Sequence, residues 1–358
     1  MKNLLDAFRT PNASTGPLYL GLELELSKHN TNIVPSGLDM MLQSETKSIP
    51  FRGNGPYCYS NTASMLLSTI GEQVSPPEME AYTGVGLGAF WLPKEKLLFF
   101  SSISNPPDLG ITRALRLLGF SFEEKMTSDP GTPPLEQLRS DLTSSAALLG
   151  PLDMGYLTHN PLHKRMMGAD HYVLAYRFEK DGVLIHDPEG FPSVLLPFRQ
   201  LELAWRADSI PYRRGHYRYW THPRRIHDPS RDELYDSTLK SFKEVYSEAE
   251  ILAAKQNWTI DAEAIATLSK HVKRDKVSPA ERGFMVFFSL KLGARRALDF
   301  ASFFGSRNPE LARLKEKQAE LFGAMQTFAV QKKWTKVADS LEHLAQVETE
   351  FRDTLISS

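Results

Sequence analysis

The single cysteine of this 358-residue chain, Cys58, stands in the stretch RGNGPYCYSNTASMLL. A Gly/Asn/Pro turn precedes it, and small and apolar residues follow it at the spacing of a helix. We therefore expect Cys58 at or near a helix N-terminus, where unpaired N–H groups and the positive end of the helix dipole favour a thiolate. A lone cysteine is also commonly a small buried hydrophobe, so a nucleophilic role depends on partners elsewhere in the chain.

A histidine and a carboxylate that suit such a thiol stand on a predicted β-hairpin. His171 begins the strand-like stretch HYVLAYRF, the turn EKDG follows, and Asp187 ends the next strand-like stretch, GVLIHDP. The midpoint between them, Glu179, lies beside the turn, so a hairpin places the two residues roughly opposite one another. The carboxylate can then hold one ring nitrogen and leave the other to face the thiol. The alternative is a strand-edge histidine and a turn-forming Asp-Pro.

The surrounding pattern predicts an α+β protein in three parts. Residues 1–48 form an extension with one half-buried strand, in which leucines alternate with other residues. Residues 49–227 mix helices and strands, including a helix that a Ser75/Glu78 capping box begins and a buried strand in AALLGPLDMGYL. Residues 228–358 contain little Gly or Pro and predict about five helices, one of them begun by Ser278 and Glu281.

Taken together, residues 50–207 resemble a known family. A cysteine that begins a helix is followed by SPPEMEAYTGVGLGAFWL, then ALLGPLDMGYL, then HYVLAYRFEKDGVLIHDP and LELAW. This order is similar to the papain-like cysteine fold, in particular to its double-glycine-peptidase-like branch. Within that branch it most resembles the N-terminal domain family of butirosin biosynthesis protein H.

The resemblance implies a papain-like domain with an antiparallel sheet, followed by a helical domain. It implies that Cys58 is the nucleophile, His171 the base and Asp187 the residue that orients His171. The expected reaction is amide-forming acyl transfer in a biosynthetic pathway for a natural product, from a thioester or other activated donor to an amine. A carrier-protein phosphopantetheine thioester is one such donor. The alternatives are a hydrolase (a peptidase or amidase) with the same triad and an inactive papain-like binding protein.

The sequence departs from the peptidases at the oxyanion donor. Arg52 stands six residues before Cys58, where those enzymes usually have glutamine. Asn54 and the backbone N–H of Cys58 are the nearest substitutes, and the departure argues more against a peptidase than against an acyltransferase. The resemblance also implies that the GVGLG stretch lies near the substrate cleft, with Gly86 as a lining residue. This stretch lacks the preceding strand and following helix of a dinucleotide-binding loop, so no cofactor is expected.

The composition argues against several other classes of protein. The 42 Lys and Arg residues balance 43 Asp and Glu residues, which argues against a general nucleic-acid binder. One cysteine fits a reducing compartment, and neither a signal-peptide pattern nor a membrane-length apolar run is evident. A cytoplasmic protein is therefore expected, with no membrane partner and with helices that could form a homo-oligomer.

Two further stretches leave alternatives open. HNPLHKRMMGADH contains His159, His163 and Asp170 beside His171, but it reads as a loop without a compact pair of ligands, so no metal is expected. Residues 205–225 interleave arginines with aromatic residues. This pattern fits a nucleic-acid surface, a surface for an acidic carrier protein, or a structural strand whose arginines pair with the acidic helices that follow.

Overall fold

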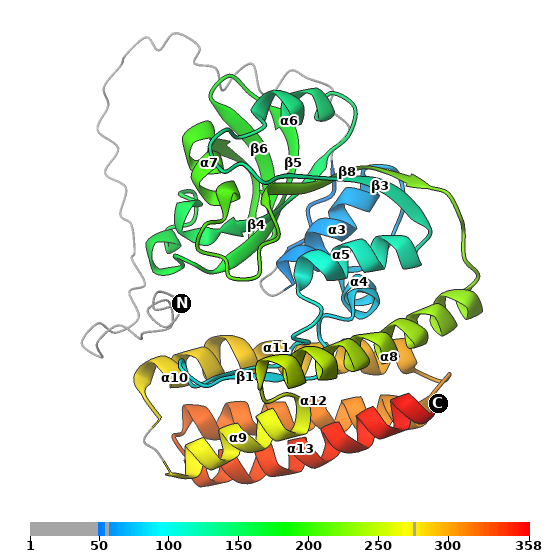
Figure 1. Cartoon of the computed structure of the whole chain (residues 1–358), viewed down its shortest axis with the longest axis vertical. Helices are drawn as coiled ribbons and strands as arrows, with labels where there is room; N and C mark the ends of the chain where they lie inside the picture. Colours follow the sequence, from blue (N-terminus) through cyan, green and yellow to red (C-terminus); the bar gives the residue numbers. More distant parts are fainter. Residues whose placement is uncertain (1–48, 54–56, 275–276) are drawn as a thin grey trace, which may run out of the picture.

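A six-stranded sheet with its own helices lies above a group of long helices in Figure 1. This is a computed structural model, and it describes residues 49–53, 57–274 and 277–358. The strand expected in residues 1–48 lies outside this range. The α+β class is confirmed, because the chain combines antiparallel sheets with a helical C-terminal part.

The sheet has the strand order β3-β8-β4-β5-β6-β7, and every neighbouring pair is antiparallel. Its buried strand β4 is the one expected in AALLGPLDMGYL, and all seven of its residues are buried. The strands are β3 (Phe120–Thr127), β4 (Ala147–Asp153), β5 (Asp170–Phe178), β6 (Gly182–Asp187), β7 (Phe191–Pro197) and β8 (His216–Arg225).

Helices cover both faces of this sheet. One hydrophobic core joins the sheet to α3, α4 and α5, and a second joins it to α6 and α7. The capping box at Ser75 and Glu78 is present, and Gly84 ends α4 in the left-handed conformation. The elements are α3 (Cys58–Ser68), α4 (Pro76–Thr83), α5 (Pro107–Leu117), α6 (Leu135–Asp141), η1 (Met154–Tyr156), η2 (His163–Arg165) and α7 (Phe198–Arg206).

The expected hairpin is the β5–β6 pair, and its register fixes the relation of His171 to Asp187. Leu174 pairs with His186, so Asp187 lies one residue and His171 three residues beyond that pair. Because side chains alternate between faces of a sheet, His171 and Asp187 share a face and lie diagonally rather than directly opposite. A diagonal neighbour is still within reach of an imidazole ring.

The chain after residue 230 is helical, as expected, with five long helices in the described part. The capping box at Ser278 and Glu281 begins a shorter sixth one, which continues through a π-helical turn into the next helix. These elements are α8 (Arg231–Gln256), α9 (Asp261–Arg274), α10 (Pro279–Phe284), η3 (Met285–Ser289), α11 (Leu290–Phe304), α12 (Pro309–Val330) and α13 (Trp334–Ser357).

A small hairpin that the sequence did not indicate joins the two parts. It consists of β1 (Phe90–Leu92) and β2 (Leu97–Phe99), and Figure 1 shows β1 among the C-terminal helices. The Trp91 N–H donates to the Thr259 carbonyl at 3.1 Å, and Trp91 lies in one hydrophobic core with residues of α9, α12 and α13. The hairpin therefore packs with the helices although it precedes the expected boundary at residue 227.

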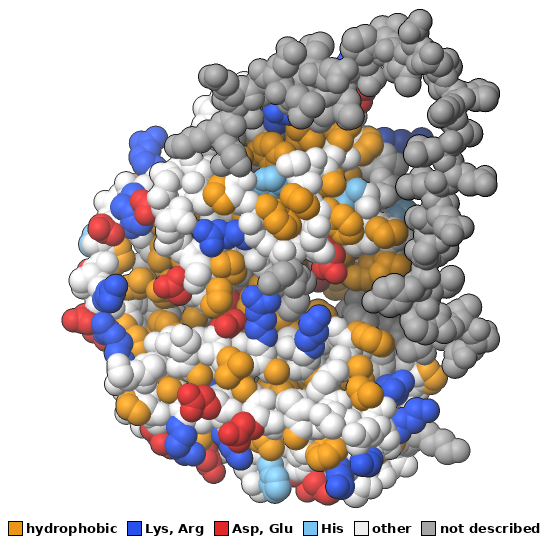
Figure 2. Space-filling model, turned by 180° about the vertical axis from the view of Figure 1, so that it is seen from behind, with side chains coloured by type: hydrophobic (Ala, Val, Ile, Leu, Met, Phe, Trp, Pro, Cys, Tyr) orange, Lys and Arg blue, Asp and Glu red, His pale blue; other side chains and the backbone are white. Residues whose placement is uncertain are grey.

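The surface agrees with the balanced composition. Figure 2 shows basic and acidic side chains interspersed over the helical part of the face in view, with neither sign gathered into one area. Within the described ranges, every helix is too short or too polar to cross a membrane.

Candidate functional site

Cys58 is the first residue of α3, as the sequence predicts. Tyr57 precedes it in the left-handed conformation (φ 79°) and gives α3 no side-chain cap. The first N–H groups of a helix have no partner within the helix, so those at the start of α3 point toward the Cys58 end. Cys58 itself is partly exposed, unlike most of α3. The Cys58 residue therefore lies beside the backbone donors of the helix start.

His171 and Asp187 form the pair that the hairpin was expected to make. His171 Nε2 lies 2.6 Å from Asp187 Oδ1, and both side chains are buried. A carboxylate only accepts, so Nε2–H donates and Nδ1 is left for the other partner. That partner is the Cys58 thiol, which lies close enough to His171 for each residue to shift the pKa of the other. The three residues expected to act together are thus joined in the order Cys58, His171, Asp187.

The pKa shifts follow from burial and from these contacts. Burial raises the pKa of the Cys58 thiol above its usual value, although the hydrogen bond and charge of His171 oppose the rise. Burial alone would lower the pKa of His171, but the charge and hydrogen bond of Asp187 outweigh it and raise that pKa well above normal. Burial likewise opposes ionisation of Asp187, yet its histidine partners bring its pKa below the usual range. The Asp187 carboxylate is therefore the member of the three that stays ionised.

A second histidine, His159, completes the surroundings of Asp187. Its Nε2 lies 2.7 Å from Asp187 Oδ2, and its ring lies edge-on to Phe191 with centroids 5.4 Å apart. The Glu189 N–H also donates to Asp187 Oδ1, at 2.8 Å. Sequence reasoning considered His159 only as a metal ligand and missed this contact. The signal was present, since His159 precedes His171 by twelve residues in one loop, but only the fold brings it to Asp187.

The expected side-chain oxyanion donor stays a prediction, because Asn54 lies outside the described residues. Arg52 is directed along α3, where its Nη2 donates to Gln73 Oε1 at 2.8 Å and its N–H lies 3.2 Å from Met65 Sδ. Its guanidinium therefore binds near the C-terminal end of α3, whereas Cys58 is at the N-terminal end. The backbone N–H of Cys58 remains as a donor at the site.

Gly86 lies against α11. A Cβ at this position would come within 2.9 Å of Arg296 Cδ and 3.0 Å of Phe300 Cε2. It lines a cavity of about 20 Å³, room for about one water molecule. Cys58, His171 and Asp187 are not among the residues that line this cavity. The GVGLG turn is thus explained by close packing between the two parts of the chain.

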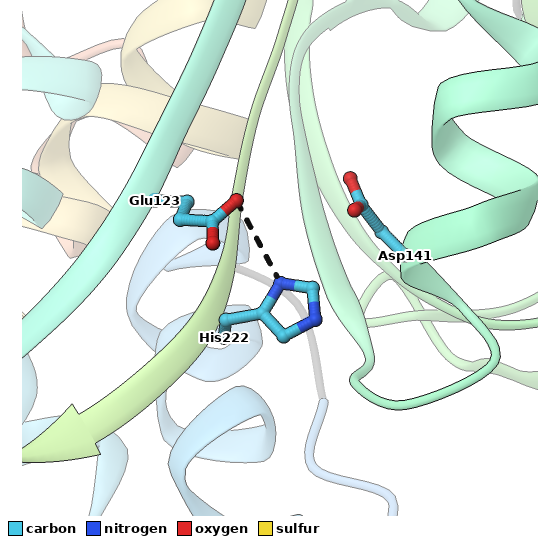
Figure 3. A group of neighbouring side chains, drawn as sticks. All are labelled: Glu123, Asp141 and His222. Carbon is cyan, nitrogen blue, oxygen red and sulfur yellow. Dashed lines mark ion pairs between the residues drawn. The ribbon is translucent and has the colours of Figure 1, made fainter.

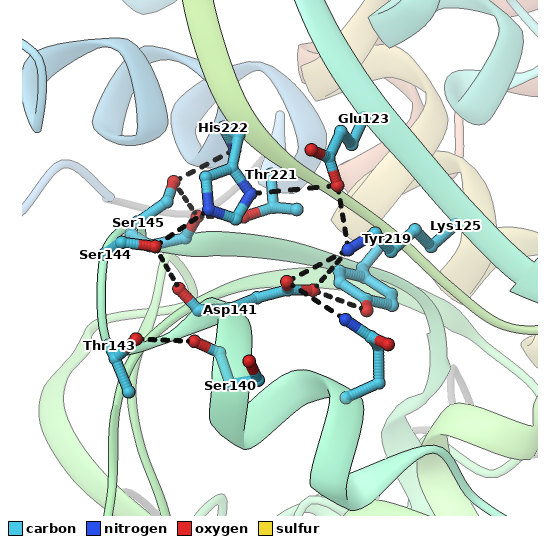
Figure 4. A network of polar contacts seen from close by, with 12 residues as sticks. Glu123, Lys125, Ser140, Asp141, Thr143, Ser144, Ser145, Tyr219, Thr221 and His222 are labelled. Atoms are coloured by element: carbon cyan, nitrogen blue, oxygen red, sulfur yellow. Dashed lines mark hydrogen bonds and ion pairs between the residues drawn. The ribbon is translucent and has the colours of Figure 1, made fainter.

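The described residues contain one cluster with the donor types of a metal site, and a lysine already occupies it. Figure 3 shows Glu123, Asp141 and His222 converging from β3, α6 and β8. Figure 4 adds Lys125, whose Nζ lies 2.8 Å from both Glu123 Oε2 and Asp141 Oδ2. The ammonium group supplies the positive charge that these carboxylates need, so the cluster is explained without a metal.

Three arginines of residues 205–225 pair with acids that precede them in the chain, not with the helices that follow. Arg214 pairs with Asp108 of α5, Arg218 with Glu124 of β3, and Arg225 with Glu72 after α3. Each of these acids precedes the arginines in the chain, because β8 lies beside β3 in the sheet. The stretch therefore provides ion pairs within the sheet part, which fits the structural reading of its composition.

Comparison with known proteins places the chain among relatives. Residues 255–356, from the end of α8 to the end of α13, match a family described as the YobF C-terminal domain. The chain is 39% identical over 304 residues to an uncharacterized protein, YobF, of Bacillus subtilis (strain 168), covering 85% of this chain and 97% of that protein. A match of that length includes both the sheet and the helices. The chain belongs to the YobF family.

Proposed function

We propose that this protein is a cysteine-dependent acyltransferase with a papain-like catalytic part. The observation that carries the proposal is the continuous contact from the Cys58 thiol through His171 to Asp187. A nucleophile, a base and a group that orients the base make up the minimal machinery of covalent acyl transfer. The placement of the thiol at the start of a helix, with the other two residues on neighbouring antiparallel strands, supports the papain-like assignment.

In the first half-reaction the Cys58 proton passes to His171 Nδ1, and the sulfur attacks the carbonyl carbon of a thioester or other activated donor. The Cys58 N–H at the helix start donates to the oxyanion. The intermediate collapses, and the leaving thiolate takes the proton from His171. Cys58 then carries the acyl group as a thioester, and Asp187 stabilises the imidazolium that exists between these proton transfers.

In the second half-reaction an amine attacks the acyl-Cys58 carbonyl and gives its proton to His171. The carbon–sulfur bond breaks, the amide leaves, and the Cys58 sulfur recovers the proton. The same steps with water in place of the amine describe a hydrolase. The engagement of Arg52 with Gln73 favours the transferase, because a peptidase-type side-chain donor is absent at that position.

Intact-mass measurement tests the proposal directly. The protein is incubated with small acyl thioesters, and peptide mapping locates any added acyl group. We expect the mass of one acyl group on Cys58, none in Cys58→Ala, and much slower loading in His171→Ala. Failure of the wild-type protein to load from any thioester would overturn the proposal.

Discharge of the loaded enzyme separates the two reactions. The acyl-enzyme is diluted into buffer alone or into buffer with simple primary amines at constant pH. We expect release to accelerate with amine concentration and an amide to appear among the products. Release that is rapid in buffer and indifferent to amine would assign the protein to the hydrolases instead.

A further inference from the structure

The residue before Cys58 is held by α11 of the helical part. Tyr57 is a buried aromatic residue in the left-handed conformation. The guanidinium of Arg295 lies over its ring, 4.5 Å from the centroid. Asp299, one turn further along α11, lies beside the Tyr57 hydroxyl, and burial together with nearby carboxylates raises the pKa of that hydroxyl. Two side chains of α11 thus lie against Tyr57, the residue that precedes Cys58.

The residue after Cys58 is held by the same helix. The Tyr59 hydroxyl donates to Glu80 Oε1 at 2.7 Å, and Arg296 Nη2 donates to the Tyr59 oxygen at 2.8 Å. Arg296 Nε donates to the same Glu80 oxygen at 2.8 Å. The Arg296 and Glu80 side chains are 5% and 0% exposed, so this is a desolvated ion pair and not a surface contact.

Arg296 is itself fixed by the segment that follows β2. Its Nη1 donates to the Phe100 carbonyl at 2.6 Å and to Ser101 Oγ at 2.7 Å. All three guanidinium nitrogens therefore have partners, and those partners belong to α3, α4 and the segment after β2. A planar guanidinium held at every nitrogen has little freedom to turn, which makes α11 a rigid support for the start of α3.

The left-handed conformation of Tyr57 links these contacts to the orientation of Cys58. A bulky residue other than glycine is rare at positive φ, and it stays there when its surroundings hold it. The backbone at Tyr57 sets the direction in which Cys58 enters α3. If Tyr57 relaxes to negative φ, the Cys58 thiol turns relative to His171.

We propose that α11 positions the Cys58 thiol against His171 through Arg295 and Asp299 on Tyr57 and through Arg296 on Tyr59. The helical domain then helps to orient Cys58. Arg295 and Asp299 are positioning residues that do not touch the substrate. This inference rests on the proposed function, because it assumes that Cys58 acts with His171.

The test measures how far His171 shifts the pKa of Cys58. Since Cys58 is the only cysteine, its pKa can be read from the thiolate absorbance or from the pH dependence of alkylation by iodoacetamide. The difference in that pKa between the wild-type protein and His171→Ala gives the coupling. We expect the same difference to shrink severalfold when both proteins also carry Arg295→Ala, and to recover largely with Arg295→Lys, which restores a cation over the ring.

Two controls separate positioning from general destabilisation. Leu298→Ala removes an exposed side chain from the same helix and is expected to leave the coupling unchanged. Tyr57→Gly accepts the backbone conformation but has no ring to hold, so adding Arg295→Ala to it is expected to cause no further loss. Thermal melting of each variant shows that the folded state is being compared.

The two proposals fail in different ways. An undiminished coupling in folded Arg295→Ala and Tyr57→Gly would overturn the role of α11 and leave the proposed function intact. Equal Cys58 pKa values in the wild-type protein and His171→Ala would overturn the proposed function, and the positioning role with it.

Discussion

At the scale of single residues, the site is organised around one carboxylate. Asp187 accepts from His171 Nε2, from His159 Nε2 and from the Glu189 N–H while being fully buried. A buried charge is stable only when its lone pairs are satisfied, and here both oxygens are. The orientation of His171 therefore depends on every contact that holds Asp187 in place.

Replacing His171 with alanine tests the base. Because His171 opposes the burial that raises the Cys58 pKa, its loss should move the alkylation midpoint to higher pH. Loading from thioesters should fall by about 10²-fold or more, the usual contribution of a positioned general base. Stopped-time alkylation between pH 6 and pH 10 provides the measurement, and an unchanged profile would contradict the assignment.

Replacing His159 tests the second contact of Asp187. The pKa of Asp187 is depressed in the folded protein, so its stabilisation is present above the unfolded value near pH 4 and is lost as the pH falls. His159→Phe keeps a ring beside Phe191 but removes the donor. The free energy of unfolding should fall by about 1.5–3 kcal/mol at neutral pH, and acid unfolding should begin at a higher pH.

His159→Gln is the matched control, because its amide can still donate to Asp187. Urea unfolding at several pH values compares the two variants. Equal losses for His159→Phe and His159→Gln would mean that the hydrogen bond contributes nothing and that only the shape of the ring matters.

At the scale of elements, the first turn of α9 carries a buried carboxyl group. The Ala89 N–H donates to Asp261 Oδ1 at 3.3 Å, which links α9 to the residue before β1. Burial and the nearby charge of Glu348 raise the pKa of Asp261 to about 7. An acid whose folded pKa lies above its unfolded pKa destabilises the protein once both states are ionised.

Asp261→Asn should therefore alter the pH dependence of stability. In the wild-type protein this group lowers the free energy of unfolding as the pH rises from about 4 to 7, because the unfolded state releases its proton first. The asparagine oxygen can still accept from Ala89 but cannot ionise. We expect the variant to gain stability relative to the wild type by up to a few kcal/mol between pH 5 and pH 8, since each pKa unit is worth about 1.4 kcal/mol. Parallel pH curves for the two proteins would contradict this assignment.

At the scale of the whole molecule, the ion pair of Arg296 and Glu80 joins α11 to α4 in the interior. Removing one partner of a buried pair leaves the other charge without compensation, which costs about 3–5 kcal/mol. Arg296→Met should destabilise the protein by that amount. Adding Glu80→Gln should restore part of the loss, because the orphaned charge is then gone.

Chemical denaturation of the two single variants and the double variant measures this coupling. One cooperative transition is expected for the wild-type protein, since β1 and β2 share a hydrophobic core with α9, α12 and α13. Additive losses in the double variant would show that the pair does not link the two parts.

Local patterns in the sequence predicted the elements that carry the site. The turn and apolar stripe around Cys58 predicted a helix that begins there, and two strand-like stretches around the turn EKDG predicted the β5–β6 hairpin. Both capping boxes were identified because their residues lie three positions apart. The β1–β2 hairpin was missed, because its short strands are stabilised by distant residues such as Thr259 rather than by their own pattern.

The sequence by itself predicted that Cys58 begins a helix and that a hairpin brings His171 and Asp187 together, because a helix start and a hairpin are local structures set by residue spacing. Only the tertiary structure decided that His159 shares Asp187, that Arg52 turns toward Gln73, and that α11 grips Tyr57 and Tyr59. The physical reason is the separation along the sequence of the residues that come into contact. Contacts of α11 with α3 join residues more than two hundred positions apart, and no periodicity in a single sequence records which distant side chains the folded core brings together.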